Sequence, residues 1–209
     1  MIKWLLFDLG STLLDEEEAY KRYTKNCVRK LRVLGIDLSV EVYWKKMEEC
    51  ACKGLDPIRD TWHAVAPNEK RPLWTNEGVR LYPETKEVLE KLSSRYSLGI
   101  IANQSSDARD LLKEWGLLSY LQLIILSEEV GVAKPNPILF SYALEKIAVP
   151  AKQVVYVGDR YDNDIVPANS LGIKTVRVMH GLGKWMIEDE DSRSDYTISS
   201  LKELLKLHI

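Results

Sequence analysis

The sequence predicts an α/β fold, a Rossmann-like parallel sheet flanked by helices with an inserted helical cap. Two observations indicate this fold class. Short apolar runs of strand length recur along the chain, and helical patterns separate most of them. Between residues 15 and 78, in contrast, no strand of this kind is found, and apolar residues recur at helical spacing as far as Met47. Alternating strands and helices are typical of open parallel sheets, and the long helical stretch indicates an insert.

The apolar runs are expected to form buried strands, because most of them are apolar at consecutive rather than alternate positions. That pattern fits a parallel sheet covered by helices on both faces. The expected strands are Ile2–Phe7, Leu98–Ala102, Leu121–Leu126, Val154–Val157 and Thr175–Val178.

Helical spacing and end signals place the helices of the core. Gly116 indicates a helix C-terminus, and Ser105 or Ser106 is expected to cap the helix before it. Ser200 and Glu203 have the spacing of a capping box. The expected helices are Pro83–Leu92, Ser106–Trp115, Pro137–Ile147 and one that begins at Leu201.

Residues 15–78 are expected to form a helical cap subdomain, and residues 1–14 and 79–209 the core domain. Asp15 and Glu18 have the spacing of a capping box for the first cap helix, and Ser39 is expected to cap the second. An insert directly after the first strand can cover the carboxyl ends of the strands, where ligands bind in such sheets.

The composition is that of an ordinary globular protein, with 45% hydrophobic and 29% charged residues. A net charge of −2 gives no general attraction to nucleic acid or to an anionic membrane. No apolar run has the length of a membrane span. The three cysteines are too few for a disulfide framework. We therefore expect a cytoplasmic monomer or homodimer.

Four polar motifs follow strands or precede helices. Asp8 ends the first strand, where a carboxylate is well placed for nucleophilic or metal chemistry. Asn103 lies between a strand and a helix N-terminus, which favours phosphate binding. Lys134 precedes a helix that begins with proline and can neutralise phosphate charge.

The fourth motif, Gly158–Asp164, places three carboxylates after one apolar strand: Asp159, Asp162 and Asp164. Like charges that crowd together are costly unless a cation is close. Mg²⁺, held by a few carboxylates and by phosphate oxygens, fits this pattern.

These motifs, in this order, resemble those of the haloacid dehalogenase (HAD) superfamily, in its branch with a small helical cap. The resemblance covers nearly the whole chain. Its most specific part is the G-D-x-x-x-N-D pattern of Gly158–Asp164. It implies a phosphatase-like hydrolase of a small phosphorylated metabolite.

The resemblance also implies roles for individual residues. Asp8 would attack phosphorus and form an aspartyl phosphate. Mg²⁺ would be held by Asp8, the carbonyl of Gly10 and Asp159. Lys134 would bind the nucleophile and the phosphate. Substrate contacts would come from Ser11, Thr12 and Asn103, with support from Asn163 and Asp164.

Two positions depart from the family pattern. The family's phosphatases carry a second Asp two residues after the nucleophile, as general acid, but this chain has Gly10 there. Ala102 replaces a hydroxyl residue that contacts phosphate. His63 is one of few cap groups able to replace the acid.

Four functions therefore stay open. The first is a phosphatase whose proton comes from elsewhere, and the second is a hydrolase of a substrate with a good leaving group, such as an acyl phosphate. The third is a weak or inactive relative that binds phosphate ligands. The fourth is a 2-haloacid dehalogenase, which the acidic cluster disfavours because those enzymes work without metal.

Overall fold

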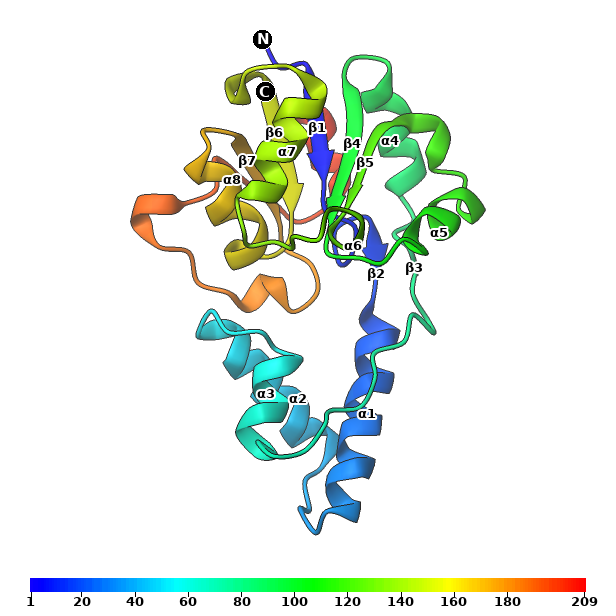
Figure 1. The fold of residues 1–209 in the computed structure, drawn as a ribbon, viewed down its shortest axis with the longest axis vertical. Coiled ribbons are helices and arrows are strands. Elements are labelled where there is room, and N and C mark those ends of the chain that lie inside the picture. The colour runs from blue at the N-terminus through cyan, green and yellow to red at the C-terminus, as the bar shows by residue number, and fades with distance from the viewer.

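The computed structural model describes residues 1–209 and is built around one six-stranded sheet (Figure 1). All neighbouring strands of this sheet pair in parallel. In spatial order the strands are β5 (Leu121–Leu126), β4 (Ser97–Ala102), β1 (Trp4–Phe7), β6 (Val154–Gly158), β7 (Lys174–Val178) and β8 (Tyr196–Ile198).

The five expected strands are therefore confirmed, with ends that differ by no more than two residues. The edge strand β8 was not predicted. It has only three residues, and Thr197 in its middle is exposed, so it has no continuous apolar run. Short, partly polar strands at a sheet edge give a weak sequence signal.

Side chains that alternate along the strands build a core on each face of the sheet. Leu5 and Phe7 of β1 belong to the larger apolar cluster, which also contains Leu89 of α4 (Thr85–Ser93). Leu6 belongs to the opposite cluster with Phe140 of α7 (Ile138–Ile147). Both faces of β1 are thus buried, as the consecutive apolar pattern predicted.

The other helices of the core are short. They include α5 (Ala108–Glu114), α6 (Ser127–Val130), α8 (Val166–Ser170) and a 3₁₀ turn, Leu201–Lys206, in place of the expected last helix. No helix of the protein combines the length and the apolar character that crossing a bilayer requires.

The helix-end predictions have mixed outcomes. The capping box of Ser200 and Glu203 is confirmed, and so is the Ser39 cap, whose Oγ accepts from Val42 N–H at 3.2 Å. The expected serine cap of α5 is wrong, because Asp107 precedes the helix and makes no side-chain cap bond. The Asp15–Glu18 box is also wrong, because α1 begins one residue later, after Glu16.

The inserted segment contains α1 (Glu17–Val33), α2 (Val40–Cys52) and α3 (Arg59–Val65), which lie below the sheet in Figure 1. These helices share an apolar cluster, built mainly from Tyr23, Leu31, Tyr43, Met47 and Trp62, to which Leu182 of the core also belongs. The division of the chain at residues 14 and 79 stays a prediction, for which this largely separate cluster is the main support.

The two chain segments that lead to the inserted helices pair with each other. β2 (Leu14–Asp15) and β3 (Arg80–Leu81) form an antiparallel ribbon, and Arg80 Nη2 contacts Asp15 Oδ2 at 2.9 Å. The strands of the main sheet point their carboxyl ends toward this ribbon and the inserted helices, away from both chain termini (Figure 1).

Candidate active site

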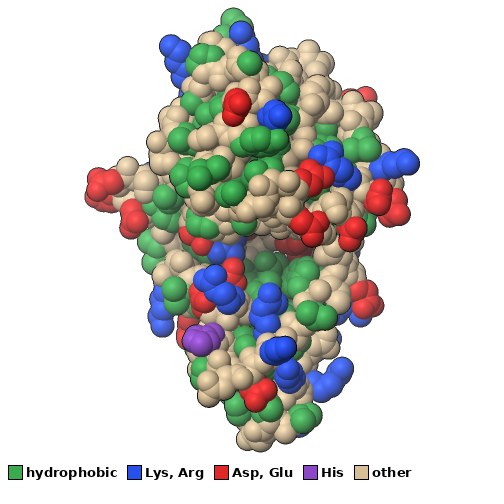
Figure 2. Space-filling view, viewed as in Figure 1, with side chains coloured by type: hydrophobic (Ala, Val, Ile, Leu, Met, Phe, Trp, Pro, Cys, Tyr) green, Lys and Arg blue, Asp and Glu red, His purple; other side chains and the backbone are tan.

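A cavity of about 300 Å³ lies where the strand ends of the core face the inserted helices. The space-filling view shows the surface hollowed between these two parts (Figure 2). The cavity collects residues from all four motifs and from the insert. Its polar lining includes Asp8, Gly10, Ser11, Glu16, Tyr20, Asp56, Asn103, Lys134, Asp159, Arg160, Asn163 and Asp164.

Lys134 is the centre of the polar network at this cavity. Its ammonium Nζ lies 2.6 Å from Asp8 Oδ1 and 2.5 Å from Asp164 Oδ1. The same ammonium donates a hydrogen bond to the Tyr156 hydroxyl at 2.9 Å. Three acceptors therefore saturate a buried cation, which fixes it beside the Asp8 carboxylate.

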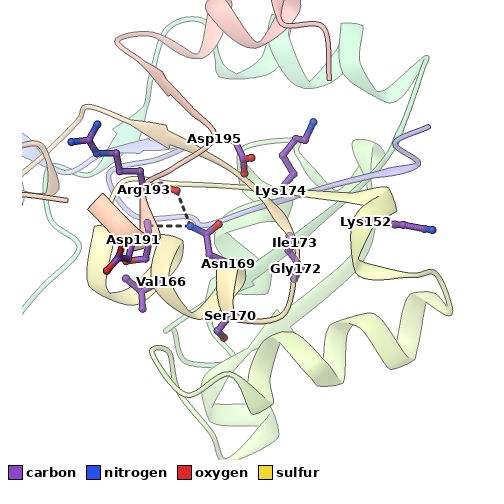
Figure 3. A pocket seen from close by; sticks show the side chains of 11 residues that line it. Lys152, Val166, Asn169, Ser170, Gly172, Ile173, Lys174, Asp191, Arg193 and Asp195 are labelled. Atoms are coloured by element: carbon purple, nitrogen blue, oxygen red, sulfur yellow. Dashed lines mark hydrogen bonds between the residues drawn. The ribbon is translucent and has the colours of Figure 1, made fainter. Parts of the chain in front are cut away.

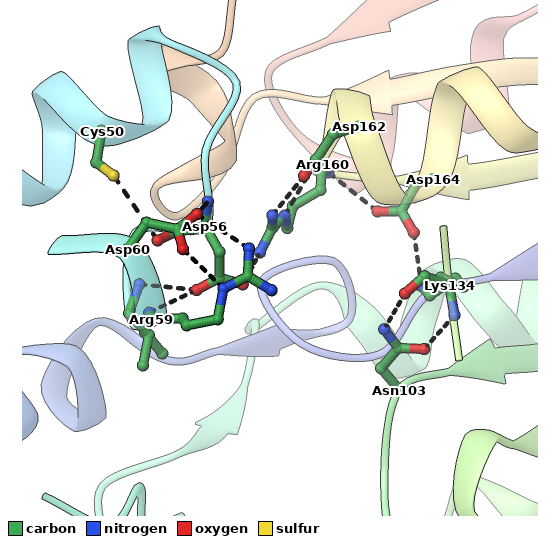
Figure 4. Close-up of polar contacts among 10 residues, drawn as sticks. Cys50, Asp56, Arg59, Asp60, Asn103, Lys134, Arg160, Asp162 and Asp164 are labelled. Atoms are coloured by element: carbon green, nitrogen blue, oxygen red, sulfur yellow. Dashed lines mark hydrogen bonds and ion pairs between the residues drawn. The ribbon is translucent and has the colours of Figure 1, made fainter. Parts of the chain in front are cut away.

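The sheet register explains how these residues meet. Phe7 of β1 pairs with Val157 of β6, and Asp8 N–H donates to Val157 O at 2.8 Å. Asp8 and Asp159 therefore leave adjacent parallel strands at the same edge. Lys134 arrives from the loop between α6 and α7, where Asn103 Oδ1 accepts from its backbone N–H at 2.7 Å (Figure 4).

The charged groups of this network shift one another's pKa values. Burial alone would lower the pKa of Lys134, but Asp164 and Asp8 hold it above its ordinary value. Burial raises the pKa of Asp8 to about 6, although Lys134 lowers it. Lys134 is therefore a permanent cation at neutral pH, and Asp8 is an anion there that burial makes more basic than an ordinary carboxylate.

A second feature of the cavity is its excess of carboxylates. Oxygen atoms of Asp8, Asp159 and Asp164 all lie within 4.8 Å of one another. Burial, and then the charges of Asp164 and Asp8, raise the pKa of Asp159 well above its ordinary range. A single ammonium does not balance three buried carboxylates, so the donor set fits a hard divalent cation such as Mg²⁺.

Asp162 does not join the acidic cluster that its sequence position suggested. Its carboxylate turns to Arg160, whose Nη2 lies 2.6 Å from Asp162 Oδ2 (Figure 4). The cluster takes its third carboxylate from Asp8 of β1 instead. Local sequence patterns could not show this, because Asp8 and Asp159 are adjacent only in the sheet; the family resemblance alone placed them in one site.

The other predicted site residues have different placements. Asn103 and Asn163 line the cavity, and Asn103 also binds both backbone polar groups of Lys134. Ser11 lines the cavity as well, and its Oγ donates to Glu16 Oε2 at 2.9 Å. Thr12 is fully buried and is not part of the cavity lining; its hydroxyl has no hydrogen-bond partner.

Three residues of the site were missed from the sequence, two that line the cavity and one, Tyr156, that contacts Lys134 from outside the lining. Tyr156 looked like part of an apolar strand, yet its hydroxyl contacts Lys134 and donates to Ile101 O at 2.9 Å. Arg160 Nη1 reaches Asp56 Oδ2 of the insert at 3.1 Å (Figure 4). Glu16 looked like one of three acidic residues at a helix start, and no periodic signal separates it from Glu17 and Glu18.

Glu16 has an unusual environment for a carboxyl group. Burial raises its pKa from 4.5 to about 7, although the hydrogen bond from Ser11 lowers it; the charges of Asp8 and Asp15 add to the increase. A carboxyl group with such a pKa exchanges protons near neutrality, which is a property of catalytic acids.

Of the cap residues, His63 does not contribute to this site. It is exposed on α3 and is absent from the cavity lining. Trp44 and Trp62 pack in the apolar cluster of the insert, whereas Trp74 packs against that cluster and also lines the cavity.

A larger surface hollow of about 570 Å³ lies at α8 and the loop before β8 (Figure 3). Asn169 crosses it and donates to the carbonyls of Ser192 and Arg193 at 3.1 and 2.9 Å. Its lining carries both basic and acidic side chains, but it contains none of the three clustered carboxylates, Asp8, Asp159 and Asp164. We therefore assign the chemistry to the smaller cavity.

Comparison with known proteins agrees with this geometry. A family described as haloacid dehalogenase-like hydrolase matches residues 5–178. A glyceraldehyde 3-phosphate phosphatase from Methanocaldococcus jannaschii is 33% identical over 99% of this chain and 97% of its own length. A protein of the same name from Methanopyrus kandleri is 28% identical over 98% and 96%.

A solved structure shows the same overall fold. The HAD phosphatase from Thermococcus onnurineus has a TM-score of 0.68 and 27% identity, with 98% of this chain and 97% of that chain covered. The similarity thus extends over the sheet and the inserted helices together.

Proposed function

Because this chain belongs to the haloacid dehalogenase-like hydrolases, we propose that it is a Mg²⁺-dependent phosphatase of a small phosphorylated metabolite. The reaction would pass through an aspartyl phosphate on Asp8. The observation that carries the proposal is the contact of 2.6 Å between Lys134 Nζ and Asp8 Oδ1 at the cavity. Phosphatases among the relatives support it at the level of the reaction.

We propose a distinct role in the reaction for each of these residues. Lys134 uses one Asp8 oxygen, Oδ1, which leaves Oδ2 to attack phosphorus. Asp164 and Tyr156 hold Lys134 in place, so its positive charge faces both the nucleophile and the incoming phosphoryl group. Asn103 and Ser11, which both line the cavity, are the proposed substrate contacts, and Asn163 supports the loop.

Asp8, the carbonyl of Gly10 and Asp159 are the proposed ligands of Mg²⁺. A bound ion would neutralise negative charge on the phosphoryl oxygens, so that the anionic Asp8 could approach phosphorus. The crowding of buried carboxylates around this position supports the assignment.

The substrate class follows from the size of the cavity and from the relatives. A cavity of about 300 Å³ is at the small end of the range for ligand sites. Two relatives are named for hydrolysis of glyceraldehyde 3-phosphate. We therefore propose phosphomonoesters of about three carbons as the class to assay first.

The test compares hydrolysis of p-nitrophenyl phosphate by wild type and by Asp8→Asn, with Mg²⁺ and with EDTA. We expect turnover only with Mg²⁺, and a loss of about 10³-fold or more in the variant, since it removes the nucleophile. Asp107→Asn, an exposed substitution beside α5, is the matched control and should keep the wild-type rate. Turnover that is independent of Asp8 or of Mg²⁺ would exclude the proposal.

A weak or inactive phosphate-binding protein is the second candidate, and Gly10 and Ala102 favour it. It predicts that inorganic phosphate with Mg²⁺ binds by calorimetry while no phosphomonoester is hydrolysed. A 2-haloacid dehalogenase is the third, and it predicts chloride release from 2-chloropropionate without Mg²⁺.

A further inference from the structure

The space beside Gly10 is occupied by a carboxyl group from another part of the chain. A Cβ atom added to Gly10 would lie 2.8 Å from both Oε1 and Oε2 of Glu16. The side chain that a larger residue at position 10 would carry is thus replaced in space by Glu16. Gly10 and Glu16 line the same cavity as Asp8.

Glu16 is held in this position by a specific contact. Ser11 Oγ donates to Glu16 Oε2 at 2.9 Å, and Ser11 takes a φ of 51° that few residues other than glycine adopt. No hydrogen bond of the protein uses Oε1 of Glu16, so this oxygen is available to a ligand. Glu17 and Glu18, its neighbours in sequence, are exposed and pair with Lys21 instead.

The other carboxyl groups of the cavity already have a partner or a proposed role. Asp56 Oδ1 accepts from the backbone N–H groups of Ile58 and Arg59, and its Oδ2 contacts Arg160. Asp164 is bound to Lys134, and Asp8 and Asp159 are the proposed nucleophile and Mg²⁺ ligand. Glu16 is therefore the carboxyl group of the cavity that has a free oxygen and no other role.

We propose that Glu16 is the general acid and base of the phosphatase reaction, in the place that Gly10 leaves without an acid. This inference rests on the proposed function. When Asp8 Oδ2 bonds to phosphorus, the bond from phosphorus to the leaving oxygen breaks, and the Glu16 carboxyl gives its proton to that oxygen. An alcohol departs and Glu16 becomes a carboxylate.

The second half of the reaction restores both residues. The Glu16 carboxylate takes a proton from a water molecule, whose oxygen bonds to phosphorus. The bond from phosphorus to Asp8 breaks, so inorganic phosphate forms and Asp8 returns to its carboxylate form. Protons and bonds balance over the cycle, and no other reactant besides water is needed.

Leaving-group dependence tests this role. Glu16→Gln keeps the shape and an acceptor for Ser11 but cannot donate an acidic proton. With an alkyl phosphate such as glycerol 3-phosphate, we expect kcat to fall by about 10²–10⁴-fold, the contribution of a general acid. With p-nitrophenyl phosphate, whose leaving group needs no proton, formation of the aspartyl phosphate should change by less than about tenfold in a pre-steady-state burst.

Glu17→Gln is the matched control, because Glu17 is the adjacent exposed glutamate, and both substrates should react at the wild-type rate. A reciprocal exchange adds a second test. Gly10→Asp alone requires the carboxyl end of the flexible Glu16 side chain to move aside, because the added Cβ would lie 2.8 Å from both of its oxygens. Gly10→Asp combined with Glu16→Ala should recover at least tenfold in alkyl phosphate turnover over Glu16→Ala alone.

The outcomes separate this inference from the proposed function. Suppose that wild type shows Asp8-dependent turnover. If Glu16→Gln then leaves alkyl phosphate hydrolysis unchanged, or slows the burst and the alkyl phosphate turnover equally, the role of Glu16 is excluded while the proposed phosphatase activity stands. The same holds if wild type cleaves aryl but no alkyl phosphates. Absence of any Asp8-dependent turnover excludes both.

Discussion

At the scale of single residues, the site depends on how one buried ammonium is saturated. Lys134 lies between Asp8 and Asp164, and the Tyr156 hydroxyl completes its acceptors while it donates to Ile101 O. Tyr156 is fully buried, so water cannot replace this hydroxyl. When a buried charged group loses a hydrogen-bond acceptor, the folded state loses free energy of stabilisation, and no new contact offsets that loss.

Tyr156→Phe is therefore expected to destabilise the protein by about 1.5–3 kcal/mol, the net value of a hydrogen bond to a charged group. Urea denaturation of wild type and variant measures the difference. Tyr43→Phe is the matched control, because Tyr43 is equally buried but its hydroxyl has no hydrogen-bond partner. Equal effects of the two substitutions would contradict the role of Tyr156.

Glu16 leads to a prediction about pH. Mainly through burial, its pKa rises from 4.5 to about 7 in the folded protein. Between these values the folded state keeps a proton that the unfolded chain has released, so the Glu16 contribution to stability is present below pH 4.5 and lost as pH rises through about 7.

Glu16→Gln should therefore flatten the fall of unfolding free energy between these pH values, measured by urea denaturation in EDTA. Glu17→Gln should follow the wild-type curve, since Glu17 is exposed. Identical slopes for wild type and Glu16→Gln would show that Glu16 titrates alike in both states.

At the scale of elements, capping interactions determine where helical turns begin and how they attach to neighbouring elements. The capping box of Ser200 and Glu203 starts the last 3₁₀ turn, and Ser200 Oγ also donates to Glu84 Oε1 at 2.8 Å. This contact links the turn to the start of α4. The sequence predicted the capping box correctly, because all of its partners lie within four residues.

Ser200→Ala should lower the unfolding free energy by about 1 kcal/mol, the usual cost of a lost cap. Thermal or urea unfolding measures it. Ser199→Ala is the control, because the Ser199 side chain is exposed and caps nothing. A smaller loss for Ser200→Ala than for Ser199→Ala would argue against the cap.

At the scale of the whole molecule, the sheet concentrates negative charge. Asp8 and Asp159 come from neighbouring strands, and Asp164 comes from the turn after β6. Repulsion among them weakens the folded state until a cation binds. Folding stability and metal binding are therefore linked.

We expect Mg²⁺ at about 100 times its Kd to stabilise wild type by about 2.7 kcal/mol, by mass action. The measurement is the increase in Tm upon addition of Mg²⁺. Asp159→Asn should abolish the increase, whereas Asp162→Asn should keep it, because Asp162 pairs with Arg160. An unchanged increase in Asp159→Asn would remove Asp159 from the metal site.

The sequence by itself determined five of the six strands of the main sheet, their parallel arrangement, and the motif residues Asp8, Lys134 and Asp159. These features depend on apolar periodicity and on residue types at strand ends, which are local. Only the tertiary structure decided that Asp162 leaves the acidic cluster, that Tyr156 holds Lys134, and that Glu16 fills the space beside Gly10. The reason is physical, since β-sheet register and the start of α1 bring together atoms whose contact no local pattern records.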